Sequence, residues 1–278
     1  MDSKKPIYLF LKWNKIAAKL AGSLPYIFLD FDGTLAPIVK NPYAAAIPAA
    51  TGEILRRLSK SKLCTIAVVS GRALADIKRR INIPGLIYSG NHGFEIKGPG
   101  VMFKKSLPAG YRSAVKDIKD ILKKKLSGIK GLIIEDKAYS VSVHYRNVRE
   151  DEIPLVEALF REAVIGHETR GDVRVKPGKM ILEIRPALDW DKGRVVLQLL
   201  ASARSKMRRG AREAVALYIG DDVTDEDAFM ALRKRGITVY VGKSENTKAS
   251  YYLKNTKEVG KLLGMVLEIL KGADHERA

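Results

Sequence analysis

The fold is decided by the stretch Tyr26-Ile-Phe-Leu-Asp30-Phe-Asp32-Gly33-Thr34-Leu35, an apolar run that ends in two aspartates and a glycine. The run before Asp30 is short and continuously apolar, which is typical of a strand buried on both faces of a parallel sheet. A carboxylate without a partner is costly inside such a strand. We therefore expect Asp30 and Asp32 at the carboxyl end of the strand, where open α/β sheets bind their ligands.

Two later stretches repeat this design. The apolar run Leu63 to Val69 is followed by Ser70, and the run Ala214 to Ile219 is followed by Gly220-Asp221-Asp222-Val-Thr-Asp225. If these strands are parallel neighbours, the polar residues at their ends converge on one crevice.

The composition suits a globular protein of one large domain or two modest ones, with 278 residues of which 46% are hydrophobic. No apolar run is long enough to predict a helix that spans a membrane. The single cysteine, Cys64, lies in the apolar strand before Ser70 and excludes an intramolecular disulfide bond. A reducing compartment is therefore expected, and the cytoplasm is the predicted location.

The chain is strongly basic, because 50 lysines and arginines outnumber 31 acidic residues and give a net charge of +19. Such an excess can attract polyanions or steer a phosphorylated substrate toward the protein. The basic residues are spread over many segments, and no recognition-helix or RNP-like pattern is present. Specific nucleic-acid binding is not expected. The sequence does not fix the oligomeric state, and a monomer is favoured.

Strands alternate with helices up to about residue 90 and again after Pro186, which predicts a parallel sheet with right-handed crossovers. Between these parts the order is helix, two strands, helix, two strands, with Pro177-Gly178 as a predicted hairpin turn. The predicted fold class is therefore α/β: a Rossmann-like core formed by residues 1–107 and 187–278, with an inserted α+β domain at 108–186.

The three strand ends predict a phosphate-transferring site. Clustered carboxylates of Asp30, Asp32 and Asp221 repel one another unless a cation is present, and hard oxygen ligands suit Mg²⁺. One aspartate can then attack phosphorus, while the second protonates the leaving alcohol and later deprotonates water. Lys192 and the Ser70 hydroxyl can balance the charge of the phosphoryl group. The alternatives are an Asx turn for the aspartates and an exposed lysine for Lys192.

These residues resemble the haloacid dehalogenase (HAD) superfamily of phosphotransferases, and the insertion resembles its type C2 cap. More narrowly, the chain resembles trehalose-6-phosphate phosphatases between about Tyr26 and Asp227, and residues 1–24 carry no matching motif. The matching pieces occur in the family's order: Leu29-Asp-Phe-Asp-Gly-Thr-Leu35, Ser70-Gly-Arg72, Gly90-Asn-His-Gly93, His144-Tyr-Arg146, Leu182-Glu-Ile-Arg-Pro186, Trp190-Asp-Lys-Gly193 and Gly220-Asp-Asp-Val-Thr-Asp-Glu-Asp227.

The resemblance implies Mg²⁺-dependent hydrolysis of trehalose 6-phosphate through an aspartyl-phosphate, in trehalose biosynthesis. It implies Asp30 as nucleophile, Asp32 as acid and base, and Ser70 and Lys192 as ligands of the phosphoryl oxygens. The implied metal site consists of Asp30, the main-chain carbonyl of Asp32, Asp221 and Asp225, with Asp222 nearby. The candidate substrate-binding residues are Gly33, Thr34, Arg72, Asn91, His92, Gly93, His144, Arg146, Lys179, Glu183 and Arg185.

Other interpretations stay open at this point. The substrate of a capped phosphatase could instead be sucrose 6-phosphate or mannosyl-3-phosphoglycerate, and a phosphomannomutase is a further alternative. A different class is a polyanion-binding protein on a disabled HAD fold, which the positive charge favours. For His144 and Arg146 the alternative role is a solvent-facing strand, and for Arg185 it is a structural ion pair with Glu183.

Overall fold

The computed structural model describes residues 5–137, 139–205, 212–243 and 246–275. The chain divides into two compact units. The core unit comprises Met1–Phe103 and Trp190–Ala278, and the inserted unit comprises Lys104–Asp189. The limits of 108 and 186 for the insertion stay a prediction.

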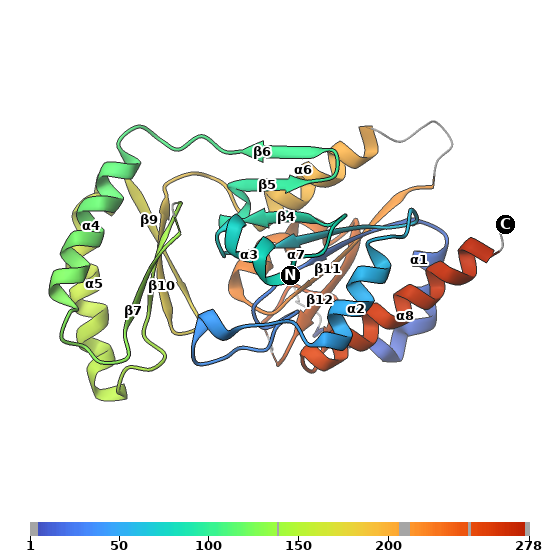
Figure 1. Ribbon diagram of the computed structural model, residues 1–278, viewed down its shortest axis with the longest axis horizontal. Helices are drawn as coiled ribbons and strands as arrows, with labels where there is room; N and C mark the ends of the chain where they lie inside the picture. The colour runs from blue at the N-terminus through green and yellow to red at the C-terminus, as the bar shows by residue number, and fades with distance from the viewer. Residues whose placement is uncertain (1–4, 138, 206–211, 244–245, 276–278) are drawn as a thin grey trace. The chain divides into compact units, whose positions relative to one another are not determined.

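The core unit contains a nine-stranded sheet within the described residues (Figure 1). Its strands pair in parallel from β1 to β4, and β5 turns back antiparallel to β4. From one edge to the other they are β1 (Ile7–Tyr8), β13 (Tyr251–Leu253), β12 (Gly236–Val241), β11 (Ala214–Gly220), β2 (Leu24–Leu29), β3 (Thr65–Val69), β4 (Ile87–Gly90), β5 (Glu95–Gly98) and β6 (Val101–Lys104).

The strand order reverses beside β2. The chain runs from β2 to β3 and β4 in one direction, and later from β11 to β12 and β13 in the other. Strands β2 and β11 are neighbours in register, with Leu29 opposite Ile219. Asp30 and Asp221 therefore leave adjacent strands at the switch point of the sheet, the position at which α/β folds bind ligands.

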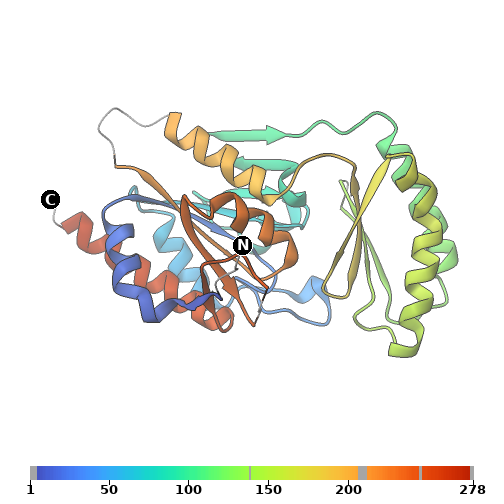
Figure 2. The ribbon, with the colours of Figure 1, turned by 180° about the vertical axis from the view of Figure 1, so that it is seen from behind.

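Helices cover both faces of this sheet (Figures 1 and 2). The period-two alternation of β2 explains the two layers: Ile27 and Leu29 belong to one hydrophobic core, and Tyr26 and Phe28 to the other. The first core takes side chains from α1 (Trp13–Ala21), α2 (Ala49–Leu58), α3 (Leu74–Ile81) and α8 (Thr256–His275), and the second from α6 (Lys192–Ser205) and α7 (Glu226–Leu232).

The inserted unit is a four-stranded antiparallel sheet with two helices on one face (Figures 1 and 2). Val141, Val143 and Ile184 face α4 (Tyr111–Lys125) and α5 (Ile153–Thr169) in a separate hydrophobic core. The strands lie in the order β7 (Ile133–Asp136), β8 (Val141–His144), β10 (Ile181–Pro186) and β9 (Val173–Gly178). The helix and strand content expected for the insertion is thus present.

The structure corrects the hairpin turn predicted at Pro177-Gly178. Both residues belong to β9 and pair with β10, Pro177 with Leu182 and Gly178 with Ile181. The turn is formed by residues 179–180, and Met180 has a φ of 62°. β9 tolerates a proline because it is an edge strand, where a residue that lacks the N–H donor for a ladder hydrogen bond costs little.

Other elements were not anticipated from the sequence. The hairpin of β5 and β6 continues the sheet, and short 3-10 helices occur at Leu9–Lys12, Pro42–Ala44, Asn91–Gly93, Glu150–Glu152 and Val223–Asp225. Cys64 precedes β3 rather than lying in it and is only partly buried. Across the described residues, none of the helices combines the length and the apolar character that crossing a membrane requires.

Candidate active site

The loop after β2 is a tight turn that presents the two aspartates. The carbonyl of Phe31 accepts hydrogen bonds from the amides of Leu35 at 3.0 Å and Ala36 at 2.8 Å. The amide of Gly33 donates to the carbonyl of Ala36 at 2.7 Å. The amide of Asp30 donates to the carbonyl of Ile219 at 3.0 Å, so that Asp30 is attached to β11.

Gly33 allows Asp221 to approach this turn. Its φ is +82°, and a β-carbon at this position would lie 2.1 Å from Asp221 Oδ2. Thr34 is fully buried, and its Oγ1 lies 3.5 Å from Asp221 Oδ1. The predicted substrate-binding residues Gly33 and Thr34 therefore line the acidic cluster itself.

Asp30, Asp221 and Asp225 form that cluster. Each offers a carboxylate oxygen, these oxygens lie within 4.8 Å of one another, and all three residues are buried. Burial raises the pKa of Asp30 well above its ordinary value; Asp225 and Asp221 raise it further, while Lys192 opposes them. Hard oxygen donors at this spacing, with a glycine where a β-carbon would intrude, fit a small divalent cation.

Lys192 is the cation that the structure places in this cluster. It begins α6, is 2% exposed, and its Nζ lies 3.1 Å from Asp30 Oδ1 and 2.7 Å from Asp225 Oδ1. Burial acts to lower the pKa of Lys192, but Asp225 and Asp30 outweigh it and the net pKa is raised. The ammonium group is thus protonated at neutral pH and faces the carboxylate predicted to be the nucleophile.

Asp225 is fully engaged by hydrogen bonds. Its Oδ1 accepts from Lys192 and, at 2.6 Å, from the hydroxyl of Tyr218. Its Oδ2 accepts from the backbone amides of Asp221 at 3.1 Å and Asp222 at 3.0 Å. The arrangement orients Lys192 and the loop after β11, and Tyr218 is a supporting residue that the sequence analysis did not identify.

Hydrogen bonds connect the loops that follow β3 and β4. Ser70 Oγ accepts a hydrogen bond from the amide of Arg72 at 3.1 Å, and the carbonyl of Ser70 accepts from the amide of His92 at 2.9 Å. The amide of Asn91 donates to the carbonyl of Arg72 at 2.7 Å. The structure therefore brings together four predicted site residues from two separate motifs: Ser70 and Arg72, and Asn91 and His92.

The Gly90–Gly93 loop has the features of a binding segment. Asn91 and His92 adopt left-handed φ values of 51° and 54°, which a non-glycine residue adopts at an energetic cost. Asn91 Oδ1 is buried and accepts no hydrogen bond from the described residues. A buried acceptor in this condition suits contact with a ligand. Gly93 follows with a φ of 96°, and a β-carbon there would meet Val195.

Arg72, predicted to bind substrate, forms hydrogen bonds with Asp32. Its Nε and Nη2 donate to the two Asp32 carboxylate oxygens at 2.7 Å each. The Asp32 side chain is 43% exposed, whereas that of Arg72 is 7% exposed. The pair therefore holds Asp32 at the surface of the site with a defined orientation.

In the inserted unit, Glu183 is at the centre of a polar network on the sheet. It is 4% exposed, and its Oε1 accepts from Ser140 at 2.8 Å and from Ser142 at 3.3 Å. Lys137 Nζ lies 3.3 Å from the same oxygen, and Arg185 Nε donates to Oε2 at 2.7 Å. The pairing of Arg185 with Glu183, considered above as the structural alternative, is present.

The other predicted residues of the inserted unit, His144, Arg146 and Lys179, lie near the turn between β9 and β10. His144 Nε2 is 2.9 Å from Glu135 Oε2, and Arg146 Nη2 donates to the carbonyl of Lys179 at 2.7 Å. His144 is opposite Ile181 in the pairing of β8 with β10. Their association with a sugar stays a prediction.

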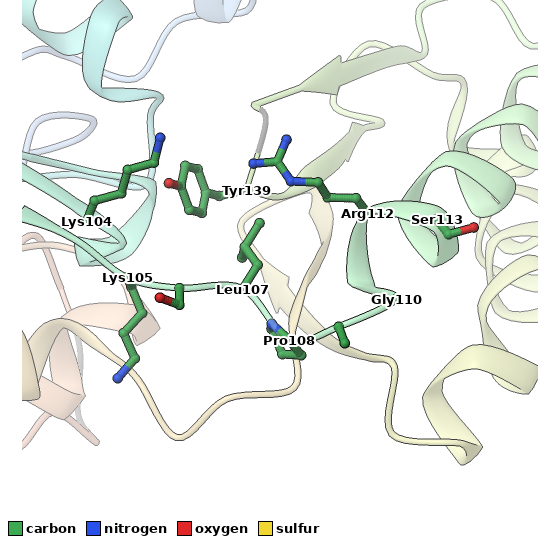
Figure 3. A pocket seen from close by; sticks show the side chains of 10 residues that line it. Lys104, Lys105, Leu107, Pro108, Gly110, Arg112, Ser113 and Tyr139 are labelled. Carbon is green, nitrogen blue, oxygen red and sulfur yellow. The ribbon is translucent and has the colours of Figure 1, made fainter.

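The inserted unit also contains a cavity of about 650 Å³ beside the start of α4 (Figure 3). Basic side chains of Lys104, Lys105 and Arg112 surround it together with Tyr139. None of the predicted substrate-binding residues lines this cavity. The residues that line it thus differ from those of the polar network around Glu183.

Comparisons with known proteins show which family this chain resembles. The model of the family Trehalose-phosphatase matches residues 28–257. The trehalose-phosphate phosphatase of Mycobacterium tuberculosis is 38% identical over 227 residues, which cover 81% of this chain and 56% of that protein. The chain thus spans little more than half the length of this curated relative.

Solved structures agree with this assignment. The C-terminal domain of the Candida albicans trehalose-6-phosphate phosphatase superposes with a TM-score of 0.79 at 26% identity, covering 96% of this chain and 99% of that one. A haloacid dehalogenase-like hydrolase from Bacteroides thetaiotaomicron, 18% identical with a TM-score of 0.59, covers 87% of this chain and 99% of its own and shares the fold. The predicted HAD-type α/β fold is confirmed, and the chain belongs to the trehalose-phosphatase family.

Proposed function

We propose that this protein is a Mg²⁺-dependent phosphatase that hydrolyses trehalose 6-phosphate to trehalose and phosphate, in trehalose biosynthesis. The observation that carries the proposal is the position of Lys192 Nζ, 3.1 Å from Asp30 Oδ1, within a buried carboxylate cluster in a member of this family. Together with a bound divalent cation, such a cluster can stabilise the charge of a transferring phosphoryl group.

The reaction has two steps in this proposal. A carboxylate oxygen of Asp30 attacks phosphorus, the bond from phosphorus to the sugar oxygen breaks, and Asp32 gives its proton to that oxygen. Asp32 then takes a proton from water, whose oxygen attacks phosphorus and releases phosphate from Asp30. Lys192 and the Ser70 hydroxyl bind the phosphoryl oxygens throughout.

The metal site consists of Asp30, the main-chain carbonyl of Asp32, and Asp221. When bound, Mg²⁺ lowers the repulsion among the carboxylates and stabilises the charge of the transferring phosphoryl group. Asp225 contributes chiefly by holding Lys192, because its two oxygens already accept hydrogen bonds from four donors.

The polar side chains of the inserted unit are proposed to recognise the sugar. A site built to hydrogen-bond hydroxyl groups rejects substrates that leave its polar groups unpaired. The candidates are Glu183, Lys179, Arg146, His144 and Arg185. Asn91 and His92 are the corresponding candidates in the core unit, and the unpaired Asn91 Oδ1 supports this role.

A panel of phosphorylated sugars tests the substrate. Phosphate release is measured with and without Mg²⁺ for trehalose 6-phosphate, sucrose 6-phosphate, mannosyl-3-phosphoglycerate and mannose 6-phosphate. We expect the highest kcat/KM with trehalose 6-phosphate and a reversible loss of activity on chelation of the metal. A clear preference for another ester would replace the proposed substrate while leaving the phosphatase assignment in place.

The covalent step is tested by Asp30→Asn, which removes the nucleophilic charge and keeps the shape. We expect its turnover to fall to background, because an amide does not form the phosphoryl ester, while its thermal unfolding stays cooperative. The matched control is Asp117→Asn, at an exposed position on α4, which should leave turnover unchanged. Near-normal hydrolysis by Asp30→Asn would disprove the aspartyl-phosphate.

A polyanion-binding protein on a disabled fold is the remaining alternative. The acidic cluster and Lys192 are both present, which argues against a fold that has lost its catalytic residues. Salt-sensitive DNA binding without phosphate release from any ester would favour this alternative.

A further inference from the structure

Asp76 on α3 binds three arginine side chains. Its Oδ2 accepts hydrogen bonds from Arg72 Nη1 at 3.0 Å and Arg80 Nε at 2.7 Å, and its Oδ1 accepts from Arg79 Nη2 at 2.8 Å. Arg79 and Arg80 lie three and four positions after Asp76 on the same side of α3, whereas Arg72 precedes the helix. The Asp76 side chain is 19% exposed.

Two of these arginines connect Asp76 with the loop after β2. Arg72 reaches both carboxylate oxygens of Asp32 and the carbonyl of Pro42, the latter at 2.8 Å. Arg80 Nη1 donates to the carbonyls of Tyr43 at 3.0 Å and Ala45 at 2.9 Å. The third, Arg79, is 77% exposed, and among the described residues its hydrogen bond is to Asp76 rather than to this loop.

The guanidinium of Arg72 is fixed from several sides. Asp32 binds its Nε and Nη2, Asp76 binds its Nη1, and the ring of Phe31 lies 5.3 Å from its central carbon. The planar fork of arginine makes such bidentate contacts directional. Without Asp76, the Nη1 edge of Arg72 would lose its carboxylate partner, and Arg72 and Arg80 would face each other as largely buried cations.

We propose that Asp76 is a positioning residue of the phosphatase reaction, which holds the Arg72 guanidinium so that Arg72 fixes the orientation in which the Asp32 carboxyl group delivers its proton to the leaving alcohol. This inference rests on the proposed function, because it takes Asp32 as the proton donor. An alcohol leaves poorly as an alkoxide, so the orientation of the donor governs the cleavage of a sugar phosphate.

An ester with a better leaving group separates this role from a structural one. 4-Nitrophenyl phosphate releases a stabilised phenolate that needs little protonation, whereas a sugar phosphate needs the proton from Asp32. We compare kcat/KM, which reports the steps up to loss of the alcohol, for both esters. The sugar phosphate is whichever member of the panel the wild-type enzyme cleaves best.

For Asp76→Asn we expect kcat/KM to fall about 10- to 100-fold with the sugar phosphate and less than about threefold with 4-nitrophenyl phosphate. The matched control is Arg79→Ala, which removes a partner of Asp76 that reaches neither Asp32 nor the loop. It should leave both values unchanged. Thermal unfolding shows which variants are folded at the assay temperature.

Arg72→Lys keeps the test decisive if Asp76→Asn does not fold. Lysine retains the charge but not the bidentate contact, so the same selective loss is expected. Parallel losses with the two esters, or an equal effect of Arg79→Ala, would overturn the inference and leave the proposed function intact. If the wild-type protein cleaves neither ester, the proposed function fails and this inference fails with it.

Discussion

At position 33 the chain requires a residue without a β-carbon. The left-handed φ of Gly33 is costly for other residues, and the space beside it is taken by Asp221. We therefore predict that Gly33→Ala displaces the Asp221 carboxylate from the cluster. The expected result is a fall of at least about 100-fold in kcat/KM for the sugar phosphate, together with weaker Mg²⁺ binding. Phosphate release and calorimetric titration with Mg²⁺ measure the two effects.

Gly52 provides the control for this substitution. It lies within α2, where an added β-carbon meets nothing within 4 Å. Gly52→Ala should raise the free energy of unfolding by about 0.5–1 kcal/mol, because alanine favours the helix, and it should leave activity unchanged. Unaltered Mg²⁺ affinity in Gly33→Ala would contradict the assigned position of Asp221.

At the scale of one element, the charge of Asp76 helps to hold α3 against the loop after β2, because Asp76 binds Arg72 and Arg80. Burial acts to raise the pKa of Asp76, but hydrogen bonds from Arg80, Arg72 and Arg79 outweigh it, and the net pKa is lowered. Because the folded pKa lies below the unfolded one, this carboxylate stabilises the fold above about pH 4. The contribution is lost as the pH falls through the folded value.

We predict that Asp76→Asn lowers the free energy of unfolding by roughly 1.5–3 kcal/mol near pH 7, the range for hydrogen bonds to charged groups. The difference from wild type should shrink as the pH falls from about 4, near the unfolded pKa, toward the lower folded pKa of Asp76, below which the wild-type carboxylate is also neutral. Urea unfolding at a series of pH values measures it. A difference that stays constant down to about pH 3 would indicate that packing, not charge, is responsible.

The strands of the core were predictable because burial on two faces produces continuous apolar runs with polar ends. The turn of the β9–β10 hairpin was not, because Pro177-Gly178 has turn composition while the register places the turn at Lys179 and Met180. Register depends on which side chains face the helices, and a single chain segment does not reveal it.

The candidate site likewise contains residues that the sequence could predict and residues that it could not. Asp30, Asp221 and Lys192 were predictable because their strand ends and helix start follow directly from the sequence pattern, and the structure brings them together. Asp76 and Tyr218 were not, since their roles depend on contacts across the fold. An acidic residue four positions after Arg72, and a tyrosine in an otherwise aliphatic strand, were the available signals.

At the scale of the core unit, the two ends of the chain complete the sheet together. β1 forms the edge of the sheet beside β13, with Ile7 opposite Tyr251, and Tyr8 donates a hydrogen bond to Glu258 of α8 at 2.8 Å. Side chains of α1 and α8 belong to the same hydrophobic core. The segment that contains β1 and α1 lies outside residues 28–257, which match the family model, yet it packs on a face of the core sheet.

Two leucines of this segment test whether it is an integral part of the core. Leu20 is fully buried and Leu11 is 74% exposed. Leu20→Ala should lower the free energy of unfolding by about 2–5 kcal/mol, because it leaves a cavity under the sheet, whereas Leu11→Ala should change it by less than about 0.5 kcal/mol. Urea unfolding of both variants measures the contrast. Equal and small effects would mean that the segment is peripheral, and the acidic cluster would then depend on the family-matched residues alone for its support.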